Sequence, residues 1–212
     1  MPNLVDMRVI GLLCSHLCHE LVNPLGAVNN GIELLLDVGD DMRDEALALV
    51  ESSAMRTTKR VQFYRMAYGM AGMTTLGQLA EVRQLADDLL GEGRLTLEWP
   101  DAERNPTLEQ GLGRMLLNMT AAAAETLPRG GVLTVAIGQS ADAPLLSVVA
   151  RGERARVEES TRPIFAGDVA FDSLTARNVH SYYTMRVADT IGGRLEVVDS
   201  GAGEIRFAFF RN

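Results

Sequence analysis

The feature that most constrains this chain is a long run of apolar residues at helical spacing near its N-terminus. Successive members are separated by 4, 4, 3, 4 and 3 residues. They are Leu17, Leu21, Leu25, Val28, Ile32 and Leu35. At about 100° per residue these positions form one stripe, which predicts a long amphipathic helix over residues 4–37. Pro24 lies inside this helix, where we expect it to cause a kink.

A second long helix is predicted over residues 42–70, after a short turn at residues 39–41. Two long helices with a short connection form an antiparallel hairpin. A hairpin alone buries only one side of each helix, and pairing two hairpins into a four-helix bundle would complete the core. We therefore expect residues 1–72 to form a helical dimerisation domain and the chain to be a homodimer.

Residues 73–212 have a different pattern, in which short strands alternate with helices. Helices are expected near residues 75–90, 106–126 and 173–191, and strands near residues 95–99, 132–138, 145–150, 194–199 and 204–210. Asp172 is predicted to cap the last helix. This order indicates a mostly antiparallel sheet covered by helices on one face. The predicted fold class is thus α+β, a helical hairpin followed by an α/β sandwich.

Composition excludes several classes of function. Lys and Arg total 20 against 28 Asp and Glu, so the net charge is −8, and aromatic residues are only 5% of the chain. Nucleic-acid binders usually carry a basic excess and often stack bases on aromatic rings, so no nucleic-acid partner is expected. No apolar run approaches the roughly 20 residues of a membrane span, and residues 1–6 lack a basic leader. We expect a cytoplasmic protein without membrane contact, in which Cys14 and Cys18 pack in the interior rather than bind a metal.

The first helix carries a histidine on the side opposite its apolar stripe. With Leu17 at 0°, the stripe centres near about 35° and His19 projects near about 200°. Asn23, Gly26 and Asn30 project to the same outer side. A core role therefore fits His19 poorly, and without further context an idle surface histidine would be the default interpretation.

The neighbours of His19 favour chemistry over that default. A neutral imidazole can act as a nucleophile and accept a phosphoryl group as a phosphoramidate. Glu20 could hydrogen-bond the other ring nitrogen, and Asn23, one turn further on, could reach the same reaction space. Gly26 leaves a small surface on which the backbone of a partner could dock.

Residues 19–27, His-Glu-Leu-Val-Asn-Pro-Leu-Gly-Ala, resemble the H-box of bacterial histidine kinase dimerisation domains, H-E-x-x-[TN]-P-L-x-A. The resemblance implies that His19 is the phosphoacceptor, that Glu20 assists it, and that Asn23 takes the position used in phosphatase action. His19, Glu20 and Asn23 are therefore the candidate catalytic residues. Gly26 and Asn30 are the candidate partner-binding residues.

The second half resembles the Bergerat-type ATP-binding domain of the same kinases in its order of elements, but three nucleotide-binding motifs are altered. The magnesium-binding asparagine of that domain would fall at Ala122, and a methyl group cannot coordinate magnesium. Residues 150–154, Ala-Arg-Gly-Glu-Arg, lack the aspartate of the D-x-G-x-G motif. Residues 177–183, at the place of the glycine-rich phosphate loop, contain no glycine. We therefore expect a degenerate domain that does not bind ATP.

A phosphorylatable hairpin joined to a degenerate ATPase-like domain is similar to the ChpT-type histidine phosphotransferases, dimeric cytoplasmic relay proteins of bacteria. The resemblance implies that His19 takes a phosphoryl group from the receiver aspartate of a hybrid histidine kinase and passes it to response-regulator receiver domains. The receiver would supply Mg²⁺, so no cofactor or metal is expected on this chain. Two alternatives remain open: an ATP-dependent histidine kinase core with divergent boxes, and a non-catalytic module that binds receivers.

Overall fold

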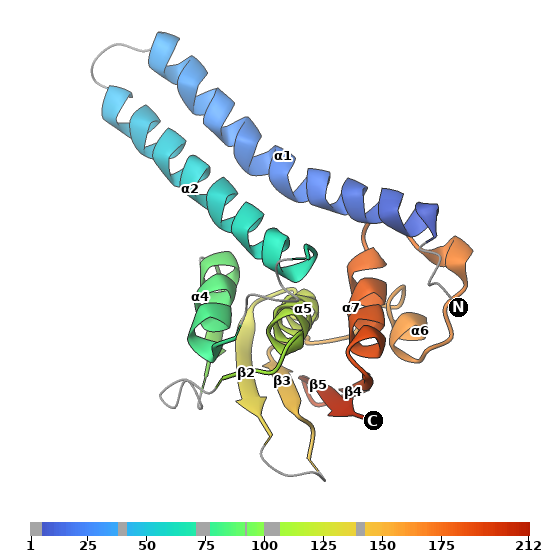
Figure 1. The fold of residues 1–212 in the computed structure, drawn as a ribbon. Coiled ribbons are helices and arrows are strands. Elements are labelled where there is room, and N and C mark those ends of the chain that lie inside the picture. The colour runs from blue at the N-terminus through green and yellow to red at the C-terminus, as the bar shows by residue number, and fades with distance from the viewer. Residues whose placement is uncertain (1–5, 38–41, 71–76, 92, 100–106, 139–142) are drawn as a thin grey trace.

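A long helical hairpin lies across one side of an α/β domain in the computed structural model, which describes residues 6–37, 42–70, 77–91, 93–99, 107–138 and 143–212 (Figure 1). The hairpin consists of α1 (Met7–Asp37) and α2 (Arg43–Ala67). The two helices come close at Gly31, where an added Cβ atom would lie only 2.7 Å from Val50 Cγ2. The absence of a side chain at this glycine therefore permits the close approach. No described helix is both long enough and apolar enough to cross a bilayer.

The face of α1 that is buried differs from the predicted apolar stripe. Val9, Pro24 and Gly31 are the buried residues of α1. Two members of the stripe, Leu25 and Ile32, are 48% and 45% exposed. The prediction of one long helix is confirmed, but within a single chain this face of the helix is not fully covered. Periodicity identifies an apolar face without identifying what packs against it.

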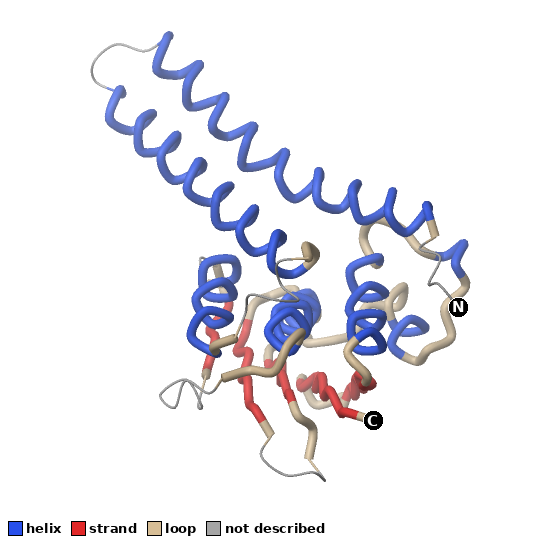
Figure 2. The backbone as a smooth tube through the Cα atoms, in the orientation of Figure 1, coloured by secondary structure: helices blue, strands red, loops and turns tan. Residues whose placement is uncertain are grey.

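The second part of the chain is a five-stranded sheet with helices on one face (Figure 2). The strands lie in the order β1 (Leu95–Glu98), β2 (Gly131–Ile137), β3 (Leu146–Arg151), β5 (Glu204–Arg211) and β4 (Gly193–Asp199). Among these strands, β1 and β2 pair in parallel, whereas β2 with β3, β3 with β5 and β4 with β5 are antiparallel. The helices are α4 (Leu79–Leu90), α5 (Leu112–Glu125), α6 (Arg162–Phe165) and α7 (Val179–Thr190). The α+β fold class and the mostly antiparallel sheet are thus confirmed.

The hairpin and the α/β domain share one hydrophobic core. Leu116 of α5 and Phe207 of β5 are fully buried at its centre. Phe63 and Ala67, in the last turns of α2, are also fully buried in the same cluster. Removing this much apolar surface from water stabilises the contact between the two parts. The C-terminal end of α2 and the α/β domain are consequently held in a defined relation.

Several predicted boundaries differ from the structure. Helix α5 begins at Leu112, later than the expected start near residue 106, which lies outside the described residues, as does the expected domain boundary at residue 72. Asp172 does not cap the last helix, because α7 begins only at Val179, after Asn178. Asn178 Oδ1 instead accepts the N–H of Thr175 at 2.7 Å, closing the turn that precedes α7. Asp172 lies in a 3₁₀ turn at Phe171–Ser173.

Candidate functional site

Four of the five residues predicted to form the site, all except Glu20, lie along one side of α1. The side chain of His19 is 78% exposed. Asn23 and Asn30 are also exposed, and a Cβ atom at Gly26 would meet no other atom within 4 Å. Their spacing of four, three and four residues places them along one side of the helix. The surface around His19 is therefore open to a macromolecular partner.

Glu20 is bound by residues of α2 and lies just beyond hydrogen-bond distance of His19. The distance from Glu20 Oε1 to His19 Nδ1 is 3.9 Å, which is longer than a hydrogen bond. Glu20 Oε2 instead accepts a short, charge-assisted hydrogen bond from Arg60 Nη1. The carboxylate also forms a hydrogen bond with the side chain of Tyr64. The expected Glu20–His19 hydrogen bond is thus not formed in this structure.

Glu20 and Arg60 line a cavity of about 270 Å³ between the hairpin and the α/β domain. The polar side chains around it come from α1, α2, α5 and α7. They are His16, Glu20, Arg60, Tyr64, Glu125 and His180. Sequence reasoning identified only Glu20 as part of a site, because the other residues are far apart in the chain and match no motif. The cavity is therefore a product of the tertiary fold.

A histidine pair forms one wall of this cavity. The rings of His16 and His180 are stacked with centroids 5.9 Å apart. His16 Nδ1 lies 3.1 Å from the backbone oxygen of Ala176, and His180 Nε2 lies 3.3 Å from that of Asn118. The hydroxyl of Tyr68 hydrogen-bonds to His180 Nδ1. With Nε2 donating and Nδ1 accepting, neutral His180 satisfies both ring nitrogens.

Burial sets the protonation of the groups around the cavity. It lowers the pKa of His180 to about 3, an effect to which the neighbouring His16 adds. Burial also lowers the pKa of His16, which its interaction with Glu20 partly offsets. Enclosure and the charge of Glu20 raise the pKa of Glu125, although water reaches this side chain and weakens both effects. Both histidines of the pair are therefore uncharged at neutral pH.

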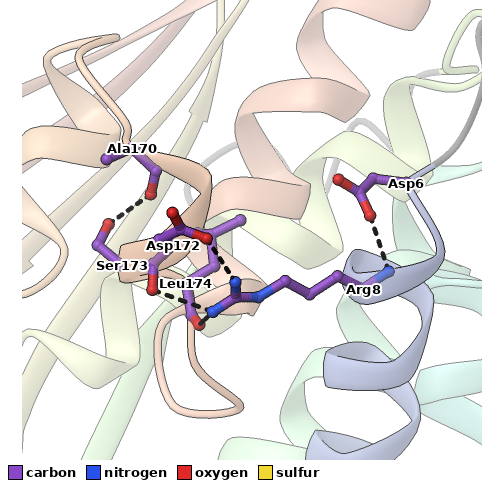
Figure 3. Close-up of polar contacts among 6 residues, drawn as sticks. All are labelled: Asp6, Arg8, Ala170, Asp172, Ser173 and Leu174. Carbon is purple, nitrogen blue, oxygen red and sulfur yellow. Dashed lines mark hydrogen bonds and ion pairs between the residues drawn. The ribbon is translucent and has the colours of Figure 1, made fainter.

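The N-terminal end of α1 is fastened to the segment before α7 (Figure 3). Arg8 Nη1 donates to Asp172 Oδ1 at 2.8 Å, and Arg8 Nη2 donates to the backbone oxygen of Asp172 at 3.0 Å. Next to Arg8, Val9 of α1 packs in a small apolar cluster with Leu174 and Val179. Residues 177–183, expected at the place of the phosphate loop, thus contact α1 through Val179.

The other altered motifs also serve structural roles. Ala122 is buried on α5. Arg151, within residues 150–154, forms a surface ion pair with Glu204 at 2.8 Å. Among the described residues, no group of three or more His, Cys, Asp or Glu side chains is placed to hold a metal ion. Cys14 and Cys18 are exposed in the single chain, so the expectation that they pack in its interior is wrong.

Comparisons with known proteins agree with this architecture. Residues 79–203 match the sequence model of the histidine phosphotransferase C-terminal domain. The protein phosphotransferase ChpT of Brucella abortus (strain 2308) is 31% identical over 187 residues, which cover 88% of each chain. A solved structure of a bacterial phosphotransferase superposes with a TM-score of 0.81 at 29% identity, covering 98% of each chain.

Proposed function

The chain belongs to the family of ChpT-type histidine phosphotransferases, and we propose that His19 is the residue on which it carries a phosphoryl group. The observation that carries this assignment is exposure. The chain has three histidines, and His19 is the exposed one. His180 is only 1% exposed, and His16 is partly buried against it. A receiver aspartate could approach His19 but neither of the others.

The proposed reaction is transfer between a receiver aspartate and His19. The lone pair of His19 Nε2 attacks the phosphorus of the acyl phosphate, forming an N–P bond. The bond between phosphorus and the carboxylate oxygen breaks, and its electron pair returns to the aspartate. A hybrid kinase receiver would supply the group, and the reverse reaction would pass it to a response regulator. Positioning and charge neutralisation supply most of such catalysis, and the receiver would contribute the Mg²⁺.

We further propose that this transfer proceeds without ATP. Ala122 replaces the asparagine of the nucleotide domain, residues 150–154 lack its aspartate, and residues 177–183 contain no glycine. A labelled-phosphate assay tests the function directly, with ATP alone in one arm and a phosphorylated receiver domain in the other. Acid-labile label from the receiver only is expected. Label from ATP alone would instead indicate a histidine kinase core, and receiver binding without label would indicate a non-catalytic module.

A homodimer built on the hairpin is the proposed assembly of this cytoplasmic relay protein, with residues 1–72 as the dimerisation domain and residues 73–212 as the degenerate ATPase-like domain. The exposed stripe of α1 supports it, because Leu25 and Ile32 are nearly half exposed in one chain. A mostly apolar groove of about 370 Å³ also runs between α1 and α2, lined in part by Leu17 and Leu21. A second hairpin packed on this face would remove both features from water.

Ile32→Glu is expected to weaken dimerisation by at least about 100-fold, because burying a carboxylate in an apolar interface costs several kcal/mol. Light scattering over a dilution series measures this shift. Val198→Glu is the matched control, since Val198 is an exposed aliphatic residue (55%) on β4 of the other domain. A wild-type dimer that persists unchanged in Ile32→Glu would contradict this interface.

A further inference from the structure

We propose that Arg60 is a positioning residue for phosphoryl transfer, which holds Glu20 so that one carboxylate oxygen faces His19. The inference rests on the proposed function of His19. Arg60 lies on α2, across the hairpin from Glu20, and both side chains are partly buried. An ion pair shielded from bulk water restricts its partners more than a fully exposed pair does. Glu20 is thus tied to the opposite helix.

The geometry assigns different roles to the two carboxylate oxygens of Glu20. Oε2 is bound by Arg60 Nη1, while Oε1 lies 3.9 Å from His19 Nδ1. A movement of about 1 Å would bring Oε1 within hydrogen-bond distance of that nitrogen. An untethered glutamate on a helix surface would distribute among several staggered rotamers instead. Arg60 keeps the Glu20 side chain in the rotamer from which Oε1 can reach His19.

This orientation matters for the chemistry of the imidazole. A carboxylate oxygen beside Nδ1 favours the tautomer with the proton on Nδ1, which leaves the lone pair on Nε2. When that lone pair forms the N–P bond, positive charge develops on the ring of His19. Glu20 can then accept the Nδ1 hydrogen bond and stabilise this charge, while the P–O electron pair leaves with the receiver aspartate. Arg60 acts on this step through Glu20 and does not touch the phosphoryl group.

The charges around Glu20 show why a cation is needed at this place. The titratable and charged groups that face it are His16, His19, Arg60, Tyr64, Glu125 and His180. His16 and His180 are uncharged at neutral pH, so Arg60 is the permanent cation facing two acidic side chains. Within the described residues, no acceptor binds the buried Nε of Arg60, so its contact with Glu20 is made through Nη1. Without Arg60, Glu20 would lose the ion pair that fixes its carboxylate in this rotamer.

The test combines transfer kinetics with a direct view of the ring. Arg60→Ala is expected to slow transfer from a phosphorylated receiver by about 10- to 100-fold, as loss of orientation does in other reactions. Arg60→Lys should recover part of the rate, because the ammonium group can still pair with Oε2. Arg43→Ala, at the start of the same helix, removes the same charge and should leave the rate unchanged. Combining Arg60→Ala with Glu20→Gln should add little to the loss from either change alone.

Two-dimensional ¹H–¹⁵N spectra of the histidine rings provide a readout that a structural role would not move. In Arg60→Ala the Nδ1–H tautomer of His19 should decrease, as it should in Glu20→Gln. Unchanged His19 signals, or fully additive kinetic losses in the double variant, would overturn the positioning role. The spectra require no receiver. If the wild-type protein acquired no label from a phosphorylated receiver, the proposed function would be refuted. The spectra would still show whether Arg60 positions Glu20.

Discussion

Replacing His19 with alanine is expected to reduce phosphoryl transfer from a receiver by at least about 1,000-fold, to the level of the background. The change removes the nucleophile itself, and the other two histidines cannot replace it, because His180 is 1% exposed and His16 is partly buried against it. The side chain of His19 is 78% exposed, so its loss should leave stability within about 0.5 kcal/mol of wild type. Transfer assays and urea unfolding measure the two effects.

His16→Gln is the informative control for this prediction, because it also removes an imidazole from α1. Its acid-labile label should remain on His19, whereas stability should fall, since His16 stacks on His180 and bonds to Ala176. Label that persists in His19→Ala and disappears in His16→Gln would show that the phosphoacceptor had been assigned to the wrong histidine.

Local sequence patterns were sufficient where structure depends on neighbours in the chain. The spacing from Leu17 to Leu35 predicted one long helix, and the strands expected near residues 194–199 and 204–210 are β4 and β5. The same angular rule placed His19 on an exposed face of α1. Each of these inferences uses only the periodicity of a helix or strand, which can be read directly from the sequence.

Patterns failed where a distant residue decides the outcome. Asp172 looks like a helix cap by its residue type, but Arg8, at the other end of the chain, binds it. Glu20 adjoins His19 in sequence, yet Arg60 from the second helix takes one of its oxygens. Cys14 was expected to pack in the interior, but it is exposed in the single chain. Composition and residue spacing carry no information on contacts between residues that are far apart in the chain. The cavity beside Glu20 could therefore not be predicted from the sequence.

The altered nucleotide motifs acquire a physical interpretation from the shared core. Phe63 and Ala67 of α2 are fully buried with residues of the α/β domain, and Arg8 fastens α1 to the segment before α7. His180, from the place of the phosphate loop, is bonded to Tyr68 of the hairpin. Within residues 177–183, expected at the place of the phosphate loop, Val179 and His180 thus contact the hairpin. We therefore expect the stability of that contact to depend on the charge state of His180.

Acid is therefore expected to destabilise the fold through His180. Its pKa is lowered from 6.5 to about 3 in the folded chain. The unfolded chain binds the proton first, so the stabilising contribution is complete above about pH 6.5 and decreases as the pH falls towards 3. The loss should amount to a few kcal/mol. Glu125 acts in the opposite direction, because its raised pKa makes the folded state take up a proton as the pH falls. A comparison of variants is needed to separate the effect of His180 on stability from that of Glu125.

Urea unfolding of wild type and His180→Gln at pH 7, 5.5 and 4.5, at one fixed protein concentration, makes that separation. His180→Gln should be less stable at pH 7, because Tyr68 and His16 lose their ring partner. Its free energy of unfolding should, however, fall less than that of wild type between pH 7 and 4.5. His19→Ala removes an exposed imidazole and should follow the wild-type pH dependence. Equal pH dependence in wild type and His180→Gln would mean that protonation of another group, and not of His180, separates the hairpin from the α/β domain in acid.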